Sequence, residues 1–355
     1  VVVDQGPDFD DIHQFPARAI APSDSLDELT VSIDPRVAEV LEQHPDVEQL
    51  GTLLDETETT AFLVVHDGRL VEERYLLGHD RYSFQNTFSI AKSFTSALVG
   101  LALRDGLLEL DAPITRYLPE LAERDARFGE ITVEHLLDMR SGIHYSRDVR
   151  FPFVNQHDPL VYYFPDLESV VLRRTTIASP PGEFQYVNYN PPLLGLILRR
   201  TTGLSPAEYL ERELWQPMGA NGPAGWTTDD QGFERMESGF YATARDLARF
   251  GQLYLDRGRI GDRPVLPEEW VLRSTDFAEP PEVEKYNGRA WGYRLGWWVV
   301  PRPDGPSDFC GIGHFGQFVY VSPQYGAVFV RNGPGRGNWG DRDWTELFYF
   351  AAERL

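Results

Sequence analysis

The residues that most directly suggest chemistry are a serine and a lysine three positions apart, in "FSIAKSF" at residues 88–94. The apolar spacing predicts a helix over 89–103, which would place Ser89 and Lys92 on one face. A serine hydroxyl is a poor nucleophile unless a neighbouring base takes its proton. Lysine can be that base when burial or nearby cationic charge lowers its pKa from about 10.4, whereas arginine stays protonated. The alternative is an ordinary helix start with Ser89 as N-cap and Lys92 as a solvated charge.

The scarcity of lysine favours the chemical interpretation. Among 33 lysine and arginine residues only two are lysines, Lys92 and Lys285. Arginine therefore occupies almost every other cationic position, and a lysine at position 92 fits a role that arginine cannot fill.

Two later motifs add groups suited to acyl transfer. "PGEFQYVNYN" places Tyr186 and Asn188 just before an expected helix, and "GIGHFGQFVYV" places His314 and Gly316 at the start of an expected strand. Acyl transfer needs donors directed at the developing oxyanion, and a glycine beside a strand edge lets a substrate carbonyl come close. The alternatives are that Tyr186 simply packs ahead of "PPLLGLIL", and that His314 is a hydrogen-bonded histidine at a strand end.

The ordered set S-x-x-K, Y-x-N and a late x-G strand resembles the serine β-lactamase and penicillin-binding-protein superfamily. Within it, the class C β-lactamase branch, with its esterase and DD-peptidase relatives, is the most similar. "ITVEHLLDMRSGI", "ESGFYATARDLARFGQLYL" and "GYRLGWW" extend the resemblance from about residue 59 to 355. "FSIAKSFTSALVG" and "GHFGQF" are most similar to the 6-aminohexanoate-dimer hydrolase and carboxylesterase subgroup.

The resemblance implies a role for each of these residues. Ser89 is the expected nucleophile, Lys92 its base or proton relay, and Tyr186 the general acid/base. The backbone N–H groups of Ser89 and Gln317 are expected to form the oxyanion hole. Asn188, His314 and Gly316 are expected to bind the substrate. Asn188 is expected to hydrogen-bond both Lys92 and the substrate. Class C enzymes carry a lysine where His314 stands, so recognition of a substrate carboxylate is expected to be weak.

Composition narrows the class of protein. The formal charge of −22 over 355 residues leaves no basic stripe for nucleic acid. No apolar run approaches the roughly 20 residues of a membrane helix. The single cysteine, Cys310, excludes an internal disulfide framework. Because the first residue is Val, a signal peptide or anchor could have been removed, and the compartment stays undetermined. The sequence does not determine the oligomeric state either. The acidity fits either a high-salt habitat or a GC-rich genome.

The order of elements predicts an α/β (α+β) fold. Residues 1–50 are acidic and contain scattered prolines, and we expect them to form a leader that lies over the surface. Regular secondary structure is expected to begin near Thr59. Strands joined by a hairpin at Asp67 precede a helical stretch, and more strands follow it. We expect one β-lactamase/transpeptidase-like domain over 51–355, with an antiparallel sheet lobe from 51–88 and 240–355 and an inserted helical lobe over 89–239.

The predicted function is a serine hydrolase that acts through an acyl-enzyme on a neutral carboxylic ester or small amide, with no metal or organic cofactor. Alternatives are a D-amino-acid peptidase, a DD-peptidase or a weak β-lactamase. A further alternative is a catalytically silent acyl-binding sensor, which is acylated but does not turn over. An intact Tyr186 argues against the sensor, because deacylation needs that group.

Overall fold

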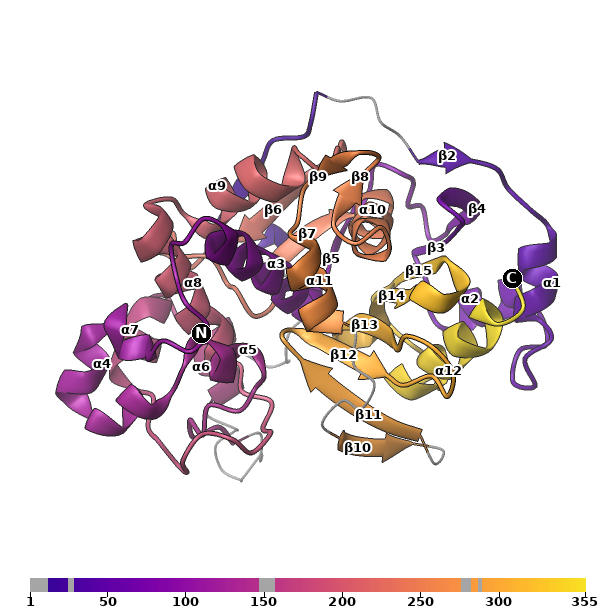
Figure 1. Ribbon diagram of the computed structural model, residues 1–355. Coiled ribbons are helices and arrows are strands. Elements are labelled where there is room, and N and C mark those ends of the chain that lie inside the picture. Colours follow the sequence, from indigo (N-terminus) through magenta and orange to yellow (C-terminus); the bar gives the residue numbers. More distant parts are fainter. Residues whose placement is uncertain (1–11, 25–28, 147–156, 276–281, 287–288) are drawn as a thin grey trace.

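A nine-stranded sheet forms the centre of the computed structural model, which describes residues 12–24, 29–146, 157–275, 282–286 and 289–355 (Figure 1). All neighbouring strands are antiparallel except the parallel pair β2–β4. The strands, in spatial order, are β10 (Glu282–Tyr286), β11 (Arg289–Arg294), β12 (Trp297–Val300), β13 (Asp308–Gly313), β14 (Gln317–Ser322), β15 (Ala327–Asn332), β3 (Ala61–His66), β4 (Arg69–Tyr75) and β2 (Thr30–Val31). The early strand β3 thus pairs with the late strand β15.

Both faces of this sheet are covered, which explains why the central strand β3 is apolar at every position from Ala61 to Val65. In β3, Leu63 and Val65 point into one hydrophobic cluster, while Phe62 and Val64 point into a second. Helices α3 (Ala91–Arg104) and α10 (Ala244–Leu255) contribute to the first cluster. Helices α1 (Arg36–Leu41), α2 (Leu50–Glu56) and α12 (Asp341–Ala352) contribute to the second and lie across the sheet from α10 (Figure 1).

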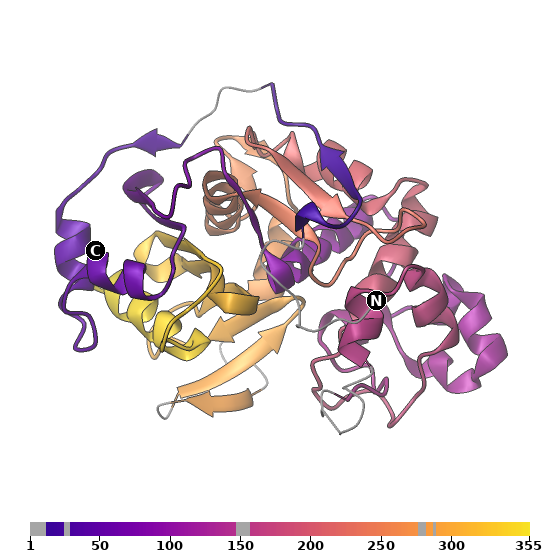
Figure 2. The ribbon, with the colours of Figure 1, turned by 180° about the vertical axis from the view of Figure 1, so that it is seen from behind.

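A helical lobe lies beside the sheet, at the right of the reverse view (Figure 2). Its helices are α4 (Pro119–Arg124), α5 (Val133–Leu137), α6 (His157–Tyr162), α7 (Leu167–Arg173), α8 (Asn190–Thr202) and α9 (Pro206–Leu210). The helix α8 passes through the middle of the lobe and packs against α3, so the lobe and the sheet share one hydrophobic core.

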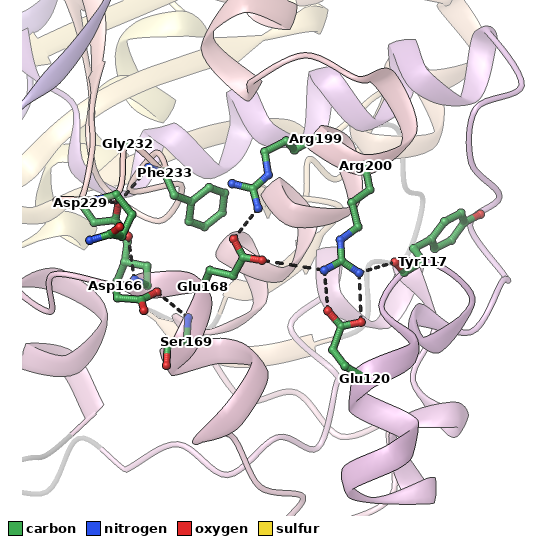
Figure 3. A network of polar contacts seen from close by, with 12 residues as sticks. Tyr117, Glu120, Asp166, Glu168, Ser169, Arg199, Arg200, Asp229, Gly232 and Phe233 are labelled. Atoms are coloured by element: carbon green, nitrogen blue, oxygen red, sulfur yellow. Dashed lines mark hydrogen bonds and ion pairs between the residues drawn. The ribbon is translucent and has the colours of Figure 1, made fainter.

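A polar network joins the helices of this lobe (Figure 3). Arg200 on α8 pairs with Glu120 on α4, and Arg199 pairs with Glu168 on α7. Asp229 accepts a 2.7 Å hydrogen bond from the Leu167 N–H at the start of α7. Exposed ion pairs stabilise little individually. Together with the Asp229 hydrogen bond, these ion pairs hold α7 in position. The preceding helix, α6, forms part of the cavity described below.

The segment before Thr59 is more ordered than its sequence suggests. It contributes β1 (Ala17–Ile20), which pairs with β6 (Ala224–Thr227) in a four-stranded sheet completed by β7 (Phe240–Thr243) and β5 (Phe84–Asn86). The strand β2 and the helices α1 and α2 also precede Thr59. Short strands of this kind form because an existing sheet edge offers unpaired backbone groups, a signal that the segment's own composition does not carry.

The remaining elements follow α10 and close the sheet lobe. They are the short hairpin β8 (Arg259–Ile260) and β9 (Arg263–Pro264), and the helix α11 (Glu268–Thr275). The predicted hairpin at Asp67 joins β3 to β4 as expected. In the parts of the chain that the structure describes, no helix has both the length and the apolar character needed to cross a membrane.

Candidate active site

A cavity of about 500 Å³ lies where the helical lobe meets the sheet. Its wall combines residues from α6, the turn before α3, the loop before α8, strands β11 to β13 and the start of α12. The lining residues are Phe88, Ser89, Asp158, Val161, Tyr162, Tyr186, Asn188, Glu237, Ser238, Trp291, Trp298, Ile312, Gly313, His314, Asp341 and Arg342. Four of the predicted site residues, Ser89, Tyr186, Asn188 and His314, therefore face one space.

Ser89 lies in a 3₁₀ turn, Phe88–Ile90, that leads into α3, rather than in the helix itself. Phe88 has a φ of 46°, a left-handed conformation that an aromatic residue adopts only when its surroundings impose it. The surroundings do so: the Asn86 side chain accepts a 3.1 Å hydrogen bond from the Phe88 N–H, and the Thr87 hydroxyl donates to the Phe240 carbonyl at 2.7 Å. This turn raises the half-buried Ser89 above the helix and into the cavity wall.

Lys92 lies one helical turn behind Ser89 and is 3% exposed. Its Nζ is 2.9 Å from Ser89 Oγ and 2.7 Å from the backbone oxygen of Glu237. Both of these partners are neutral, one a hydroxyl and the other a carbonyl. The arrangement is the one that the S-x-x-K spacing predicted, and the separation is short enough for a proton to pass between serine and lysine.

Tyr186 is held by its ring. The ring stacks on Trp298 at 6.1 Å between centroids and meets Tyr293 edge-on at 5.9 Å. Lys92 Nζ lies 5.0 Å from the centroid of the same ring. Tyr186 thus packs as the alternative interpretation required, yet it also lies on the cavity wall beside the Ser89–Lys92 pair. The two interpretations are compatible, because the ring packs while the residue still lines the cavity.

Asn188 does not make the expected hydrogen bond to Lys92. Its Nδ2 donates instead to Asp158 Oδ1 on α6 at 3.2 Å, and the Tyr145 hydroxyl donates to the same oxygen. The Asn188 Oδ1 atom is buried and, among the described residues, accepts no hydrogen bond. The amide is therefore oriented by α6, with an acceptor left for another donor.

The predicted oxyanion strand follows a tight turn at His314–Gly316, which precedes β14 rather than beginning it. A Cβ on Gly313 would lie 2.2 Å from the Thr87 carbonyl oxygen, so only glycine lets this strand approach the Ser89 turn so closely. Of the two residues predicted to supply oxyanion donors, Ser89 lines the cavity, whereas Gln317 begins β14, pairs with Gly313 of β13 and does not line the cavity. Gln317 itself is fully buried.

Glycine is needed at position 316 for a structural reason that differs from the predicted one. It does not line the cavity; its φ is 76°, and a Cβ there would lie 3.1 Å from Arg331 Nη1 below the turn. His314 is exposed on the cavity wall, beside Asp341 and Arg342 at the start of α12. Gly316 thus shapes the turn, while His314 borders the space.

Several wall residues were not singled out from the sequence. Asp158, Glu237 and Asp341 add carboxyl groups, and Tyr162 and Trp298 add aromatic surface. Trp298 could have been found, because adjacent residues of a strand face opposite ways and Trp297 points into the core. Val161 on α6 also lines the cavity.

Carboxyl groups are more numerous than cationic groups on the cavity wall, but burial favours the neutral form of two of them. Burial raises the pKa of the Glu237 carboxyl and of the Asp341 carboxyl. Arg342 and His314 are the groups on the same wall that can carry positive charge. Within the described ranges, no cluster of three or more His, Cys, Asp or Glu side chains is placed to hold a metal ion.

Comparisons with known proteins agree with this geometry. The β-lactamase family model matches residues 48–345. The 6-aminohexanoate-dimer hydrolase of Paenarthrobacter ureafaciens is 31% identical over 311 residues, which cover 84% of this chain and 76% of that protein. A solved structure from Bacillus anthracis, provisionally described as a 6-aminohexanoate-dimer hydrolase, has a TM-score of 0.84 at 25% identity and covers 96% of this chain and 91% of its own.

A class C β-lactamase structure superposes with a TM-score of 0.65 at 16% identity, covering 90% of this chain and 96% of that one. At this identity the likeness concerns the fold alone. Together these matches confirm the predicted fold class and the predicted resemblance. The roles assigned to individual residues stay predictions.

Replacing Lys92 with arginine should separate charge from basicity. Lys92→Arg keeps the positive charge but removes a group that can accept the serine proton, so kcat should fall by about 10²–10⁴. Steady-state kinetics measure this, with thermal unfolding to establish the folded fraction. Lys285→Arg, which changes the only other lysine, is the matched control and should retain parental kcat. A Lys92→Arg enzyme within about tenfold of the parent would show that Lys92 acts only through its charge.

Removing one hydroxyl should distinguish the chemical role of Tyr186 from its packing role. Tyr186→Phe keeps the ring between Trp298 and Tyr293, so we expect a large loss of turnover with little change in melting temperature. Tyr254→Phe, a buried tyrosine packed 4.7 Å from Trp297 and outside the cavity wall, is the control. Accumulation of acyl-enzyme, detected by intact mass, would locate the defect in deacylation. A lower melting temperature with unchanged activity per folded molecule would contradict the chemical role.

Proposed function

We propose, from the premise that this chain belongs to the β-lactamase family, that it is a serine hydrolase that forms an acyl-enzyme at Ser89 and acts on a neutral carboxylic ester or small amide. The observation that carries the proposal is the buried Lys92 Nζ, 2.9 Å from Ser89 Oγ on a cavity wall. An unactivated serine would need no such partner.

The proposed reaction has two halves. Ser89 Oγ attacks the substrate carbonyl while its proton passes to Lys92, and the resulting oxyanion accepts a hydrogen bond from the N–H of Ser89, which lines the cavity. Collapse of this intermediate breaks the bond to the leaving group, which takes a proton delivered through Tyr186. Water then loses a proton to Tyr186 as it attacks the acyl-enzyme, and Ser89 recovers its proton as the acid leaves.

The wall of the cavity supports a neutral substrate. Tyr162 and Trp298 offer apolar faces to an acyl or leaving group, and Asp158 would repel a nearby carboxylate. Position 314 carries an imidazole in place of the ammonium found in class C enzymes. An amide substrate is supported by the 31% identical relative, whose name gives it a 6-aminohexanoate dimer.

Covalent labelling tests the nucleophile. We expect a fluorophosphonate to add to Ser89 alone, because Lys92 is paired with that serine. Intact mass gives the stoichiometry and peptide mapping gives the position. Ser89→Ala should lose both labelling and hydrolysis, with Ser93→Ala, one turn closer to the core, as a control for changes in the same helix. Undiminished labelling of Ser89→Ala would sink the proposal.

Substrate preference tests the electrostatic part of the proposal. A short-chain p-nitrophenyl ester should be hydrolysed with kcat/KM at least about a hundredfold above nitrocefin, roughly 2.7 kcal/mol in transition-state binding, because nitrocefin carries a carboxylate. His314→Lys should narrow this ratio by raising activity on nitrocefin. If the parent already favours nitrocefin, or the lysine variant leaves the ratio unchanged, pocket shape rather than charge sets the preference.

A further inference from the structure

A small aromatic cluster, separate from the two large hydrophobic clusters, includes part of the cavity wall. Its members come from four separate parts of the chain and are Phe15, Phe88, Tyr162, Tyr163 and Phe315. The two buried members, Phe88 and Tyr162, both line the cavity. Phe15 packs against them from residues 12–20, which we call the arm. Because Phe15 does not itself line the cavity, it supports this wall from behind.

The arm is fixed to the protein directly after Phe15. The Pro16 carbonyl accepts a 2.7 Å hydrogen bond from the Thr228 N–H, and the next four residues form β1, which pairs with β6. Arg18 adds a 3.1 Å ion pair to Glu234, whose side chain is buried. The backbone beside Phe15 therefore has a defined place, and its half-buried ring is held against the molecule.

Phe15 contacts the ring of Tyr162, the last residue of α6. The two rings meet edge-on at 5.7 Å between centroids, and the Phe15 ring lies 6.0 Å from the ring of Tyr163. Edge-on aromatic pairs stabilise a defined geometry beyond the area that they bury. The contact therefore restrains the direction of the Tyr162 side chain.

Arg235 connects the backbone of Tyr162 to the same phenylalanine. Its guanidinium carbon lies 4.2 Å from the centroid of the Phe15 ring, and its Nη1 donates to the Tyr162 carbonyl. Arg235 is 2% exposed, and its Nε–H has no hydrogen-bond acceptor among the described residues. A cation so poorly supplied with acceptors gains from the face of an aromatic ring. Phe15 thus supports the Tyr162 ring directly and the Tyr162 backbone through Arg235.

We propose that Phe15 is a positioning residue that sets the depth of the cavity by holding Tyr162 in its wall, and so limits the length of the apolar group on a substrate. The inference rests on the proposed function, because it specifies which neutral esters are accepted. The arm precedes residues 48–345, which match the family model, so the family match does not predict this contact. A phenylalanine with a merely structural role would stabilise the arm without affecting chain-length preference.

The test measures chain-length preference in the Phe15→Ala enzyme. Without the Phe15 ring, Tyr162 has space behind it and can move away from the cavity, which then accepts a longer chain. One pair of substrates, p-nitrophenyl octanoate and butyrate, varies the acyl group. A second pair, octyl and butyl acetate, varies the leaving group. In one of the pairs, we expect the long-to-short ratio of kcat/KM to rise at least about fourfold, the gain from burying one further methylene group.

The pair in which the ratio rises identifies the part of the substrate that Tyr162 borders. A rise in either pair supports the inference. Parental ratios in both pairs would overturn it.

Phe84→Ala is the matched control. Phe84 is half-buried like Phe15 and also contacts the arm, with its ring 5.6 Å from the His13 ring and 5.1 Å from the Tyr241 ring, but it does not line the cavity. Its replacement should lower the melting temperature and leave both ratios at their parental values. An equal rise in Phe84→Ala would assign the effect to general loosening of the arm and would contradict a specific role for Phe15.

Phe15→Leu covers the case in which Phe15→Ala does not fold. Leucine keeps apolar volume behind Tyr162 but offers no ring, so we expect a smaller rise in the same ratio, about twofold, because only part of a methylene group's space is opened. A folded Phe15→Leu enzyme with parental ratios would count against the inference. These outcomes are separable from failure of the proposed function, in which the parent itself would show no hydrolysis or labelling dependent on Ser89.

Discussion

The buried amine of Lys92 is the constraint on which the rest of the site depends. Because it is 3% exposed, its hydrogen bonds must come from the protein, and they come from Ser89 Oγ and the Glu237 carbonyl. The first contact requires a turn that places the serine one helical turn ahead. The second requires the chain after the helical lobe to return to α3. The cavity, the helix and the returning chain are therefore positioned by the same group.

Local spacing explains what could be predicted and long-range packing explains what could not. Ser89 and Lys92 are three residues apart, so their contact follows from helical geometry alone. The partner of Asn188 does not follow in this way, because Asp158 reaches it from α6 through the packing of two helices. Gly316 was predicted to bind the substrate. The position of Arg331 shows instead that glycine is needed there for the shape of the turn.

Two strained phenylalanines brace the site from either side. Phe88 precedes Ser89 and Phe315 lies two residues before Gln317, and both are left-handed. Their rings meet edge-on at 5.6 Å, and Phe88 also contacts the His314 ring at 5.7 Å. The unfavourable backbone at each expected N–H donor is thus held by packing against the other. Each turn is also held by its own hydrogen bonds, from the Phe88 N–H to Asn86 and from Arg331 to the Phe315 and Gly316 carbonyls.

The pairing of β3 with β15 has a consequence for biosynthesis. The hairpin β3–β4 leaves the ribosome early, yet the strand that pairs with its apolar edge is made almost last. At about 5–20 residues per second, the interval is on the order of tens of seconds. During that time an unpaired strand reading "AFLVV" is exposed to other chains. The sheet of the nascent protein therefore stays incomplete beside β3 until β15 has been made.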